Sequence, residues 1–167
     1  MLQNFSMSKK LSILPFRSDL APLFKNINEE WIRDMFQLES KDNKILENPQ
    51  TEIIEKGGHI LFVEDEQFGI VGTVALLKTG DSEYELTKMG VLKKARGRKA
   101  GEFLLSAIIE KAKHIKAKKL YLLTNRKCES AIHLYEKKGF YHDSGIMKQF
   151  GAQYDRCDVA MNFKNLD

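Results

Sequence analysis

The most informative pattern of hydrophobic and polar positions runs from residue 83 to residue 115, where the period of the apolar residues changes. Residues 83–91 alternate loosely between apolar and polar side chains, which is typical of a strand. After Gly101 the apolar residues recur at helical spacing. The pattern therefore predicts a strand over 83–91 and a helix over about 100–115, whose apolar stripe is Leu104, Leu105, Ala107, Ile108, Ile109, Ala112 and Ile115.

Upstream of this stretch the sequence predicts strands, short helices and a hairpin. Asn28 has a side chain suited to an N-cap and is followed by Glu29 and Glu30, so a helix is expected to begin there. Turn-forming residues separate the other segments. In chain order we expect a strand over 11–16, a short helix over 19–26, the helix capped by Asn28, a polar loop over 41–49, a helical turn over 50–55, and strands over 59–64 and 69–77.

Downstream, residues 119–124 are almost entirely apolar, as expected for a strand that helices cover on both faces. Because a helix connects it to the strand over 83–91, the two strands should be parallel. A helix over 130–138 should end at Gly139. The chain is then expected to close with a hairpin of strands 141–144 and 154–163, joined by a long loop that contains residues 145–151.

The segment between the predicted strand and helix, residues 96–101, combines two glycines with three cationic side chains. A helix N-terminus has free N–H groups and the positive end of the helix dipole, and glycine allows a ligand to approach the backbone closely. Together these features indicate a phosphate-binding loop. The P-loop pattern G-x-x-x-x-G-K-[ST] and the dinucleotide pattern G-x-G-x-x-G are both absent from this segment.

Two motifs resemble those of the GNAT N-acetyltransferase superfamily. Residues 96–101 resemble its motif A loop, [Q/R]-x-x-G-x-[G/A], which cradles the pyrophosphate of coenzyme A. Lys99 departs from the pattern, because a glycine stands there in the family. Residues 120–140 resemble motif B and end in A-x-x-L-Y-E-K-x-G-F. The resemblance implies an α/β fold: a mixed sheet of six to seven strands, antiparallel at first, with a splayed parallel pair at the centre and helices on both faces.

The resemblance also implies a site for acetyl-CoA, the acetyl donor. The backbone of the strand before the loop would pair with the pantetheine arm, and Gly90 indicates a bulge or a close approach within that strand. Asn125 resembles the position that binds the pantetheine amides, and Ser130 could bind them too or merely cap its helix. The cofactor residues implied are Met89, Gly90, Val91, Arg96, Gly97, Arg98, Lys99, Ala100, Gly101, Asn125 and Ser130.

Two residues are candidates for proton transfer. Tyr135 matches the motif B tyrosine whose hydroxyl lies near the sulfur in the superfamily, and a neutral phenol can donate a proton to a leaving thiolate. Glu85 stands where some superfamily members carry a catalytic glutamate, and a half-buried carboxylate can act as a base. Glu83, Glu30 and His59 are rival bases.

The function implied is an N-acetyltransferase acting on a primary amine by direct attack. A CoA-binding regulatory module without turnover is an alternative, against which Tyr135 argues. The net charge of +4, concentrated between residues 93 and 119, leaves a nucleic-acid-binding domain as a third hypothesis. The chain shows no aromatic–basic platform of the kind that single strands need, so we expect no nucleic-acid partner.

Length and composition add limits. The 167 residues fit a leader over 1–10 and one domain over 11–167. With no long apolar run and no signal-peptide pattern, the expected location is the cytoplasm, away from membranes. Cys128 and Cys157 show no metal-binding pattern, so no metal is expected. The acceptor would be a small-molecule or peptidyl amine, and a homodimer is left open. Five acidic residues hint at a cationic acceptor: Glu29, Glu30, Glu39, Asp42 and Glu47.

Overall fold

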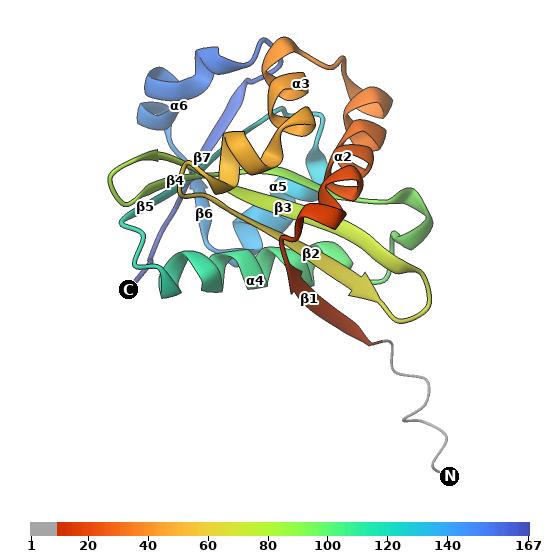
Figure 1. Ribbon diagram of the computed structural model, residues 1–167. Helices are drawn as coiled ribbons and strands as arrows, with labels where there is room; N and C mark the ends of the chain where they lie inside the picture. Colours follow the sequence, from red (N-terminus) through yellow and green to blue (C-terminus); the bar gives the residue numbers. More distant parts are fainter. Residues whose placement is uncertain (1–9) are drawn as a thin grey trace.

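The computed structural model describes residues 10–167, and its centre is a seven-stranded sheet with the order β1-β2-β3-β4-β5-β7-β6 (Figure 1). The pairs are antiparallel except for β4 and β5, which are parallel. This confirms the expected mixed α/β fold. The strands are β1 (Leu11–Pro15), β2 (His59–Asp65), β3 (Gly69–Gly80), β4 (Glu83–Val91), β5 (Lys119–Thr124), β6 (Phe140–His142) and β7 (Val159–Phe163).

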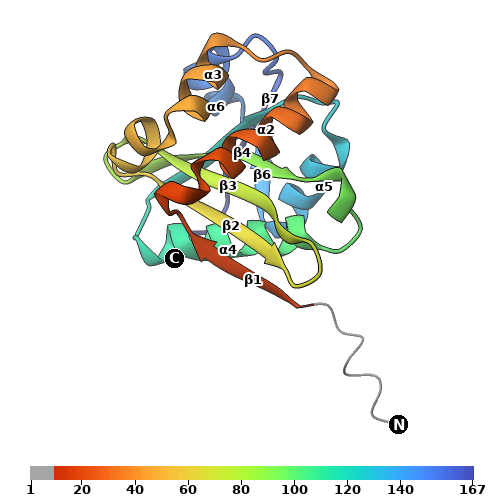
Figure 2. The same ribbon diagram turned by 45° about the vertical axis from the view of Figure 1, so that its right-hand side comes forward.

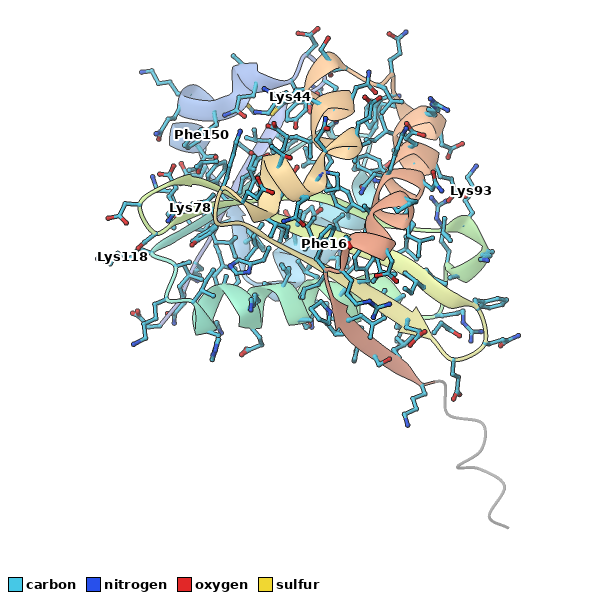
Figure 3. The ribbon with its side chains drawn as sticks, viewed as in Figure 1. Phe16, Lys44, Lys78, Lys93, Lys118 and Phe150 are labelled. Carbon is cyan, nitrogen blue, oxygen red and sulfur yellow. The ribbon has the colours of Figure 1, made fainter. Side chains whose placement is uncertain are left out.

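Helices cover both faces of the sheet, as Figures 1 and 2 show. On one face the apolar stripe of α4 packs on the first four strands, and α5 packs beside it. On the other face α2 and α3 cover β2 and β3. Phe150 of α6, labelled in Figure 3, stacks on Tyr121 of β5 at 4.2 Å between ring centroids. The bounds are α2 (Ala21–Met35), α3 (Ser40–Glu47), α4 (Ala100–His114), α5 (Glu129–Lys138) and α6 (Ser144–Phe150), with short helical turns η1 (Ser18–Leu20), η2 (Gln50–Ile54), η3 (Lys93–Ala95) and η4 (Gly151–Gln153).

The central parallel strands separate at one end. β4 and β5 pair only from Glu83 with Lys119 to Leu86 with Leu122. Beyond this point β4 bulges: the register against β3 shifts after Thr87, and Lys88 has a left-handed backbone with φ of +53°. The two strands therefore diverge toward their C-terminal ends and leave a gap in the middle of the sheet.

The prediction of two helices around Asn28 is wrong, because α2 runs through this position. Asn28 is buried inside the helix, where its Nδ2 donates to the Phe24 carbonyl at 2.9 Å. Its Oδ1 accepts a hydrogen bond from Trp31 Nε1 at 2.8 Å. An asparagine side chain that bonds the carbonyl four residues earlier continues a helix instead of capping one.

Two predicted loops are helices. Residues 41–49 form most of α3, whose start is fixed where the Glu39 N–H donates to Asp42 Oδ2 at 2.9 Å. Residues 145–151 belong mainly to α6, which Asp143 caps by accepting from the N–H of Gly145 at 2.8 Å. The turn-forming residues in both segments serve as caps, which sequence patterns alone do not separate from loops.

Candidate active site

The glycine and cation segment forms the expected loop at the start of α4. Gly97 and Lys99 both have positive φ, +84° and +66°. Lys99 is the helix N-cap in the left-handed conformation, which explains why glycine suits this position. An added Cβ at Gly101 would lie 3.8 Å from Val91 Cγ2, an ordinary contact, so the protein itself leaves room there.

A groove of about 710 Å³ runs from this loop along the open end of β4 to the first turn of α5. It brings together most of the predicted cofactor residues, which come from β4, the loop and α5. Those that line it are Met89, Gly90, Val91, Arg96, Gly97, Lys99, Ala100, Gly101 and Ser130, and Tyr135 lines it as well.

Arg98 is held outside this groove. Its Nε donates to Asp65 Oδ2 at 2.6 Å and its Nη2 to Asp65 Oδ1 at 3.0 Å, and the guanidinium lies over the ring of Phe68. The side chain thus anchors the loop to the β2–β3 hairpin. The guanidinium is bound to Asp65 and does not line the groove, so the predicted contact between Arg98 and a cofactor stays a prediction.

The structure explains why residue 90 is a glycine. An added Cβ would lie 2.3 Å from Cδ1 of Trp31, so the indole occupies the space that a side chain would fill. The close approach expected at this glycine is therefore made by the protein's own tryptophan. Trp31 in turn lines both the groove and a smaller cavity beside it.

The smaller cavity, about 50 Å³, fills the gap between β4 and β5. Tyr135 lies at its junction with the groove and lines both. The side chain is 7% exposed, and burial raises the pKa of its phenol, so the hydroxyl keeps its proton at neutral pH. Within residues 10–167 this hydroxyl has no hydrogen-bond partner, which leaves it available to a ligand.

Asn125 lines the smaller cavity, but its amide already has partners. Nδ2 donates to the Arg156 carbonyl at 2.7 Å, and Oδ1 accepts from the N–H of Lys127 at 2.8 Å. These bonds fix the turn after β5. The predicted contact between Asn125 and the pantetheine arm stays a prediction.

None of the four candidate bases lines either cavity in the described part of the chain. Glu85 is 1% exposed, its Oε1 has no hydrogen-bond partner there, and burial raises its pKa. Glu83 accepts from Thr79, Glu30 accepts from the N–H of Lys93, and His59 lies beside Tyr84. A proton from an amine in the cavity would therefore need an intervening group to reach Glu85.

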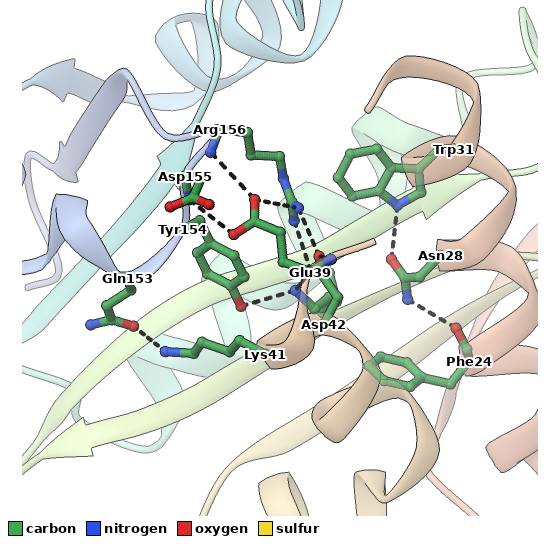
Figure 4. A network of polar contacts seen from close by, with 11 residues as sticks. Phe24, Asn28, Trp31, Glu39, Lys41, Asp42, Gln153, Tyr154, Asp155 and Arg156 are labelled. Atoms are coloured by element: carbon green, nitrogen blue, oxygen red, sulfur yellow. Dashed lines mark hydrogen bonds and ion pairs between the residues drawn. The ribbon is translucent and has the colours of Figure 1, made fainter. Parts of the chain in front are cut away.

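A buried ionic network that the sequence pattern did not predict lies on the α3 side of the cavity (Figure 4). Lys88 Nζ donates to Asp42 Oδ1 at 2.7 Å and to Tyr154 Oη at 3.0 Å. Arg156 donates from Nη1 and Nη2 to the two oxygens of Asp42 at 2.7 and 2.8 Å, and Glu39 accepts from Arg156 too. In the sequence, the one sign of this network is a lysine, Lys88, among the apolar residues of β4.

Asp42 is the centre of this network. It is fully buried, which by itself raises the pKa of a carboxyl group. Hydrogen bonds from Arg156 and the charge of Lys88 outweigh burial and lower the pKa of Asp42 to about 2. Burial also lowers the pKa of Lys88, and Asp42 opposes that shift. The carboxylate thus stays ionised and holds two cations at the wall of the cavity.

Two further observations concern the described part of the chain. Between residues 10 and 167 no three His, Cys, Asp or Glu side chains are grouped so that they could hold a metal ion. The same residues include no helix that is both long and apolar enough to cross a membrane.

A glycine loop at a helix N-terminus beside a split parallel pair is what the resemblance to the GNAT superfamily implied, and the comparisons agree. A family model described as "Acetyltransferase (GNAT) family" matches residues 22–140. The chain belongs to the GNAT acetyltransferase family. A search of curated protein sequences gives no significant match.

Solved structures with the same fold cover nearly the whole chain. A GNAT-family acetyltransferase from Staphylococcus aureus is 23% identical with a TM-score of 0.82, covering 95% of this chain and 100% of that one. The PaiA N-acetyltransferase of Thermoplasma acidophilum, in complex with coenzyme A, is 18% identical with a TM-score of 0.70, covering 93% and 99%. A spermidine N-acetyltransferase from Vibrio cholerae, in complex with CoA and spermine, is 18% identical with a TM-score of 0.66, covering 92% and 94%.

Proposed function

We propose that this protein transfers the acetyl group of acetyl-CoA to a primary amine by direct attack of the amine. The observation that carries the proposal is the continuity of the groove and the smaller cavity, with Tyr135 at their junction. One end of this continuous space offers the N-terminus of α4 to phosphates. The other end lies between β4 and β5, where backbone groups of the separated strands are free to bind a ligand.

The loop fits the pyrophosphate of the donor. Gly97 and Gly101 place no side chain on the approach to the helix N-terminus, and Lys99 adds a cation at the groove. The backbone of Met89, Gly90 and Val91 would hold the pantetheine arm along β4. When bound, acetyl-CoA supplies an acetyl group activated as a thioester.

Tyr135 would act as the general acid. As the amine nitrogen bonds to the acetyl carbon and the carbon–sulfur bond breaks, the phenol gives its proton to the departing sulfur. The raised pKa of Tyr135 ensures that the proton is present at neutral pH. The amine loses its proton to a base, for which Glu85 stays the prediction.

Gly101→Val tests the proposal, with Gly101→Ala as its matched control. The family pattern accepts glycine or alanine at this position, and an added Cβ would lie at an ordinary contact distance of 3.8 Å from Val91 Cγ2, so Gly101→Ala should retain acetyl-CoA affinity. The branched side chain of valine should push the helix N-terminus away from the pyrophosphate, so acetyl-CoA affinity, measured by calorimetry, should fall by about tenfold or more, or about 1.4 kcal/mol.

Calorimetry with wild-type protein separates the alternatives. Binding of acetyl-CoA that Gly101→Val weakens and Gly101→Ala retains, together with thiol release in the presence of amines, supports the transferase. Binding without thiol release for any amine favours a regulatory CoA module. Binding of an oligonucleotide but not acetyl-CoA would favour the nucleic-acid hypothesis and contradict the proposal.

A further inference from the structure

The walls of the smaller cavity carry positive charge and no carboxylate. Its fifteen lining residues include Lys88 and Arg156 but neither Asp nor Glu in the described chain. The other residues that line this cavity are mainly apolar or aromatic, and they include Trp31, Phe36 and Tyr154. A polycationic acceptor would find no negative partner in these walls.

Further cations surround the same aromatic rings. Tyr154 has Lys88 Nζ at 4.7 Å, Arg156 Cζ at 4.8 Å and Lys41 Nζ at 5.3 Å from its ring centroid. Phe36 has Lys127 Nζ at 4.9 Å and Arg156 Cζ at 5.7 Å. Asp42 and Glu39 offset the charges of Lys88 and Arg156, whereas Lys41 and Lys127 donate to neutral acceptors, Gln153 and the Met35 carbonyl. The cluster therefore has surplus positive charge, which a bound anion would offset.

Four of the five acidic residues that hinted at a cationic acceptor are engaged within the protein, and the fifth, Glu47, is exposed. Asp42 is fully buried between Lys88 and Arg156, and Glu39 accepts from the N–H of Asp155 and from Arg156. Glu29 and Glu30 have partners of their own in Arg33 and in the N–H of Lys93. Partners within the protein therefore largely offset the negative charge of these four residues.

Both lining cations still have hydrogen-bond capacity. Lys88 has three N–H groups, and two acceptors, Asp42 and Tyr154, are found for them within residues 10–167. Arg156 uses Nη1 and Nη2 on Glu39 and Asp42, while its Nε–H has no acceptor in that part of the chain. Both side chains line the smaller cavity, so a ligand bound there can supply the missing acceptors.

We propose that the acceptor is a small primary amine that carries a carboxylate, which binds to Lys88 and Arg156 while the amine faces Tyr135. This inference rests on the proposed function and specifies its substrate class. Lys88, Arg156 and Tyr135 line the same small cavity, so the amine and the carboxylate should lie a few bonds apart, as in an α-amino acid.

Matched amines with and without a carboxylate test the proposal. Phenylalanine is compared with phenethylamine, histidine with histamine and arginine with agmatine, with spermidine as the polycation, by thiol release and product mass. In at least one pair the carboxylate-bearing amine should show a kcat/KM about tenfold or more above its partner, and above spermidine. Faster turnover of every decarboxylated partner, or no turnover of any carboxylate-bearing amine, overturns the inference. Loss of acetyl-CoA binding would instead overturn the proposed function.

Lys41→Met gives a second measurement that does not disturb Asp42. It removes the ammonium near Tyr154 and keeps an apolar side chain of similar length. KM for the carboxylate-bearing acceptor should rise about threefold, with KM for its decarboxylated partner and for acetyl-CoA unchanged. Lys44→Met, on the same helix but paired with Glu52, is the control that should change none of them. Equal effects of Lys41→Met on both acceptors count against the inference.

Discussion

The two sides of the proposed site, a donor side that is the groove and an acceptor side that is the smaller cavity with its ionic network, are built in different ways. The donor side comes from one continuous stretch, β4 to α4, with the start of α5, and it offers mainly backbone groups and glycines. The acceptor side is assembled from side chains far apart in sequence: Asp42 bonds Lys88, 46 residues away, and Arg156, 114 residues away. Backbone sites follow from local sequence, whereas this ionic network exists only once the fold has formed.

The largest expected effect falls on the acceptor side. Asp42→Asn should lower the free energy of unfolding by about 3–5 kcal/mol, because it leaves Lys88 and Arg156 buried without their carboxylate. Urea denaturation at pH 7 measures the loss. Asp158→Asn, which removes a surface partner of Arg126, should cost at most about 1 kcal/mol. Similar losses for the two variants would show that the network contributes no more than a surface ion pair.

The donor side should respond in rate and not in stability. Tyr135→Phe should lower kcat by about ten- to ten-thousand-fold through loss of the proton donor, with acetyl-CoA affinity retained. The effect should shrink at higher pH, where the thiolate leaves without help. Tyr121→Phe is the matched control: its hydroxyl is also buried, but it lies in neither cavity, so kcat should hold. Equal kcat for wild type and Tyr135→Phe across pH 6–9 would make Tyr135 a core residue.

Glu85 should make the stability of the fold depend on pH. Because its folded-state pKa is raised, the protonated carboxyl is favoured in the fold, and stability is lost as pH rises from the unfolded pKa through the folded one. Glu85→Gln removes this loss, so it should stabilise the protein more at pH 8 than at pH 4. Thermal melts at both pH values measure the difference. A constant difference would indicate that Glu85 does not titrate in this range.

The smallest effect concerns Lys99. Its φ of +66° suits glycine better, so Lys99→Gly should raise stability by up to about 1 kcal/mol, reduced by the greater freedom of glycine in the unfolded chain. Acetyl-CoA KM should rise a few-fold as the groove loses a cation. Lys116→Gly is the control, because Lys116 also has a left-handed backbone, with φ of +62°, but does not line the groove. It should gain stability with KM unchanged, and an identical KM for Lys99→Gly would place that ammonium away from the phosphates.

The sequence by itself determined the donor side and the central sheet. The strands over 83–91 and 119–124 and the helix from residue 100 follow from apolar periodicity, and the loop follows from its glycines and cations. The helical character of α3 and α6 escaped this approach, because their polar, turn-forming residues serve there as caps. The predicted leader falls mostly on residues 1–9, outside the described part. At its last residue, Lys10, the carbonyl accepts from the N–H of Glu66.

Only the tertiary structure decided how the acceptor side is charged. In the sequence, nothing distinguishes Glu39 and Asp42 from the other acidic residues, and Lys88 is a single charged residue within a predicted strand. The fold brings Asp42 onto Lys88 and Arg156, turns Arg98 away to Asp65, and fills the space over Gly90 with Trp31. These contacts join residues from different elements of the fold, so the periodicity of any one element does not predict them. Their energies depend on burial and distance, which the order of residues along a chain does not contain.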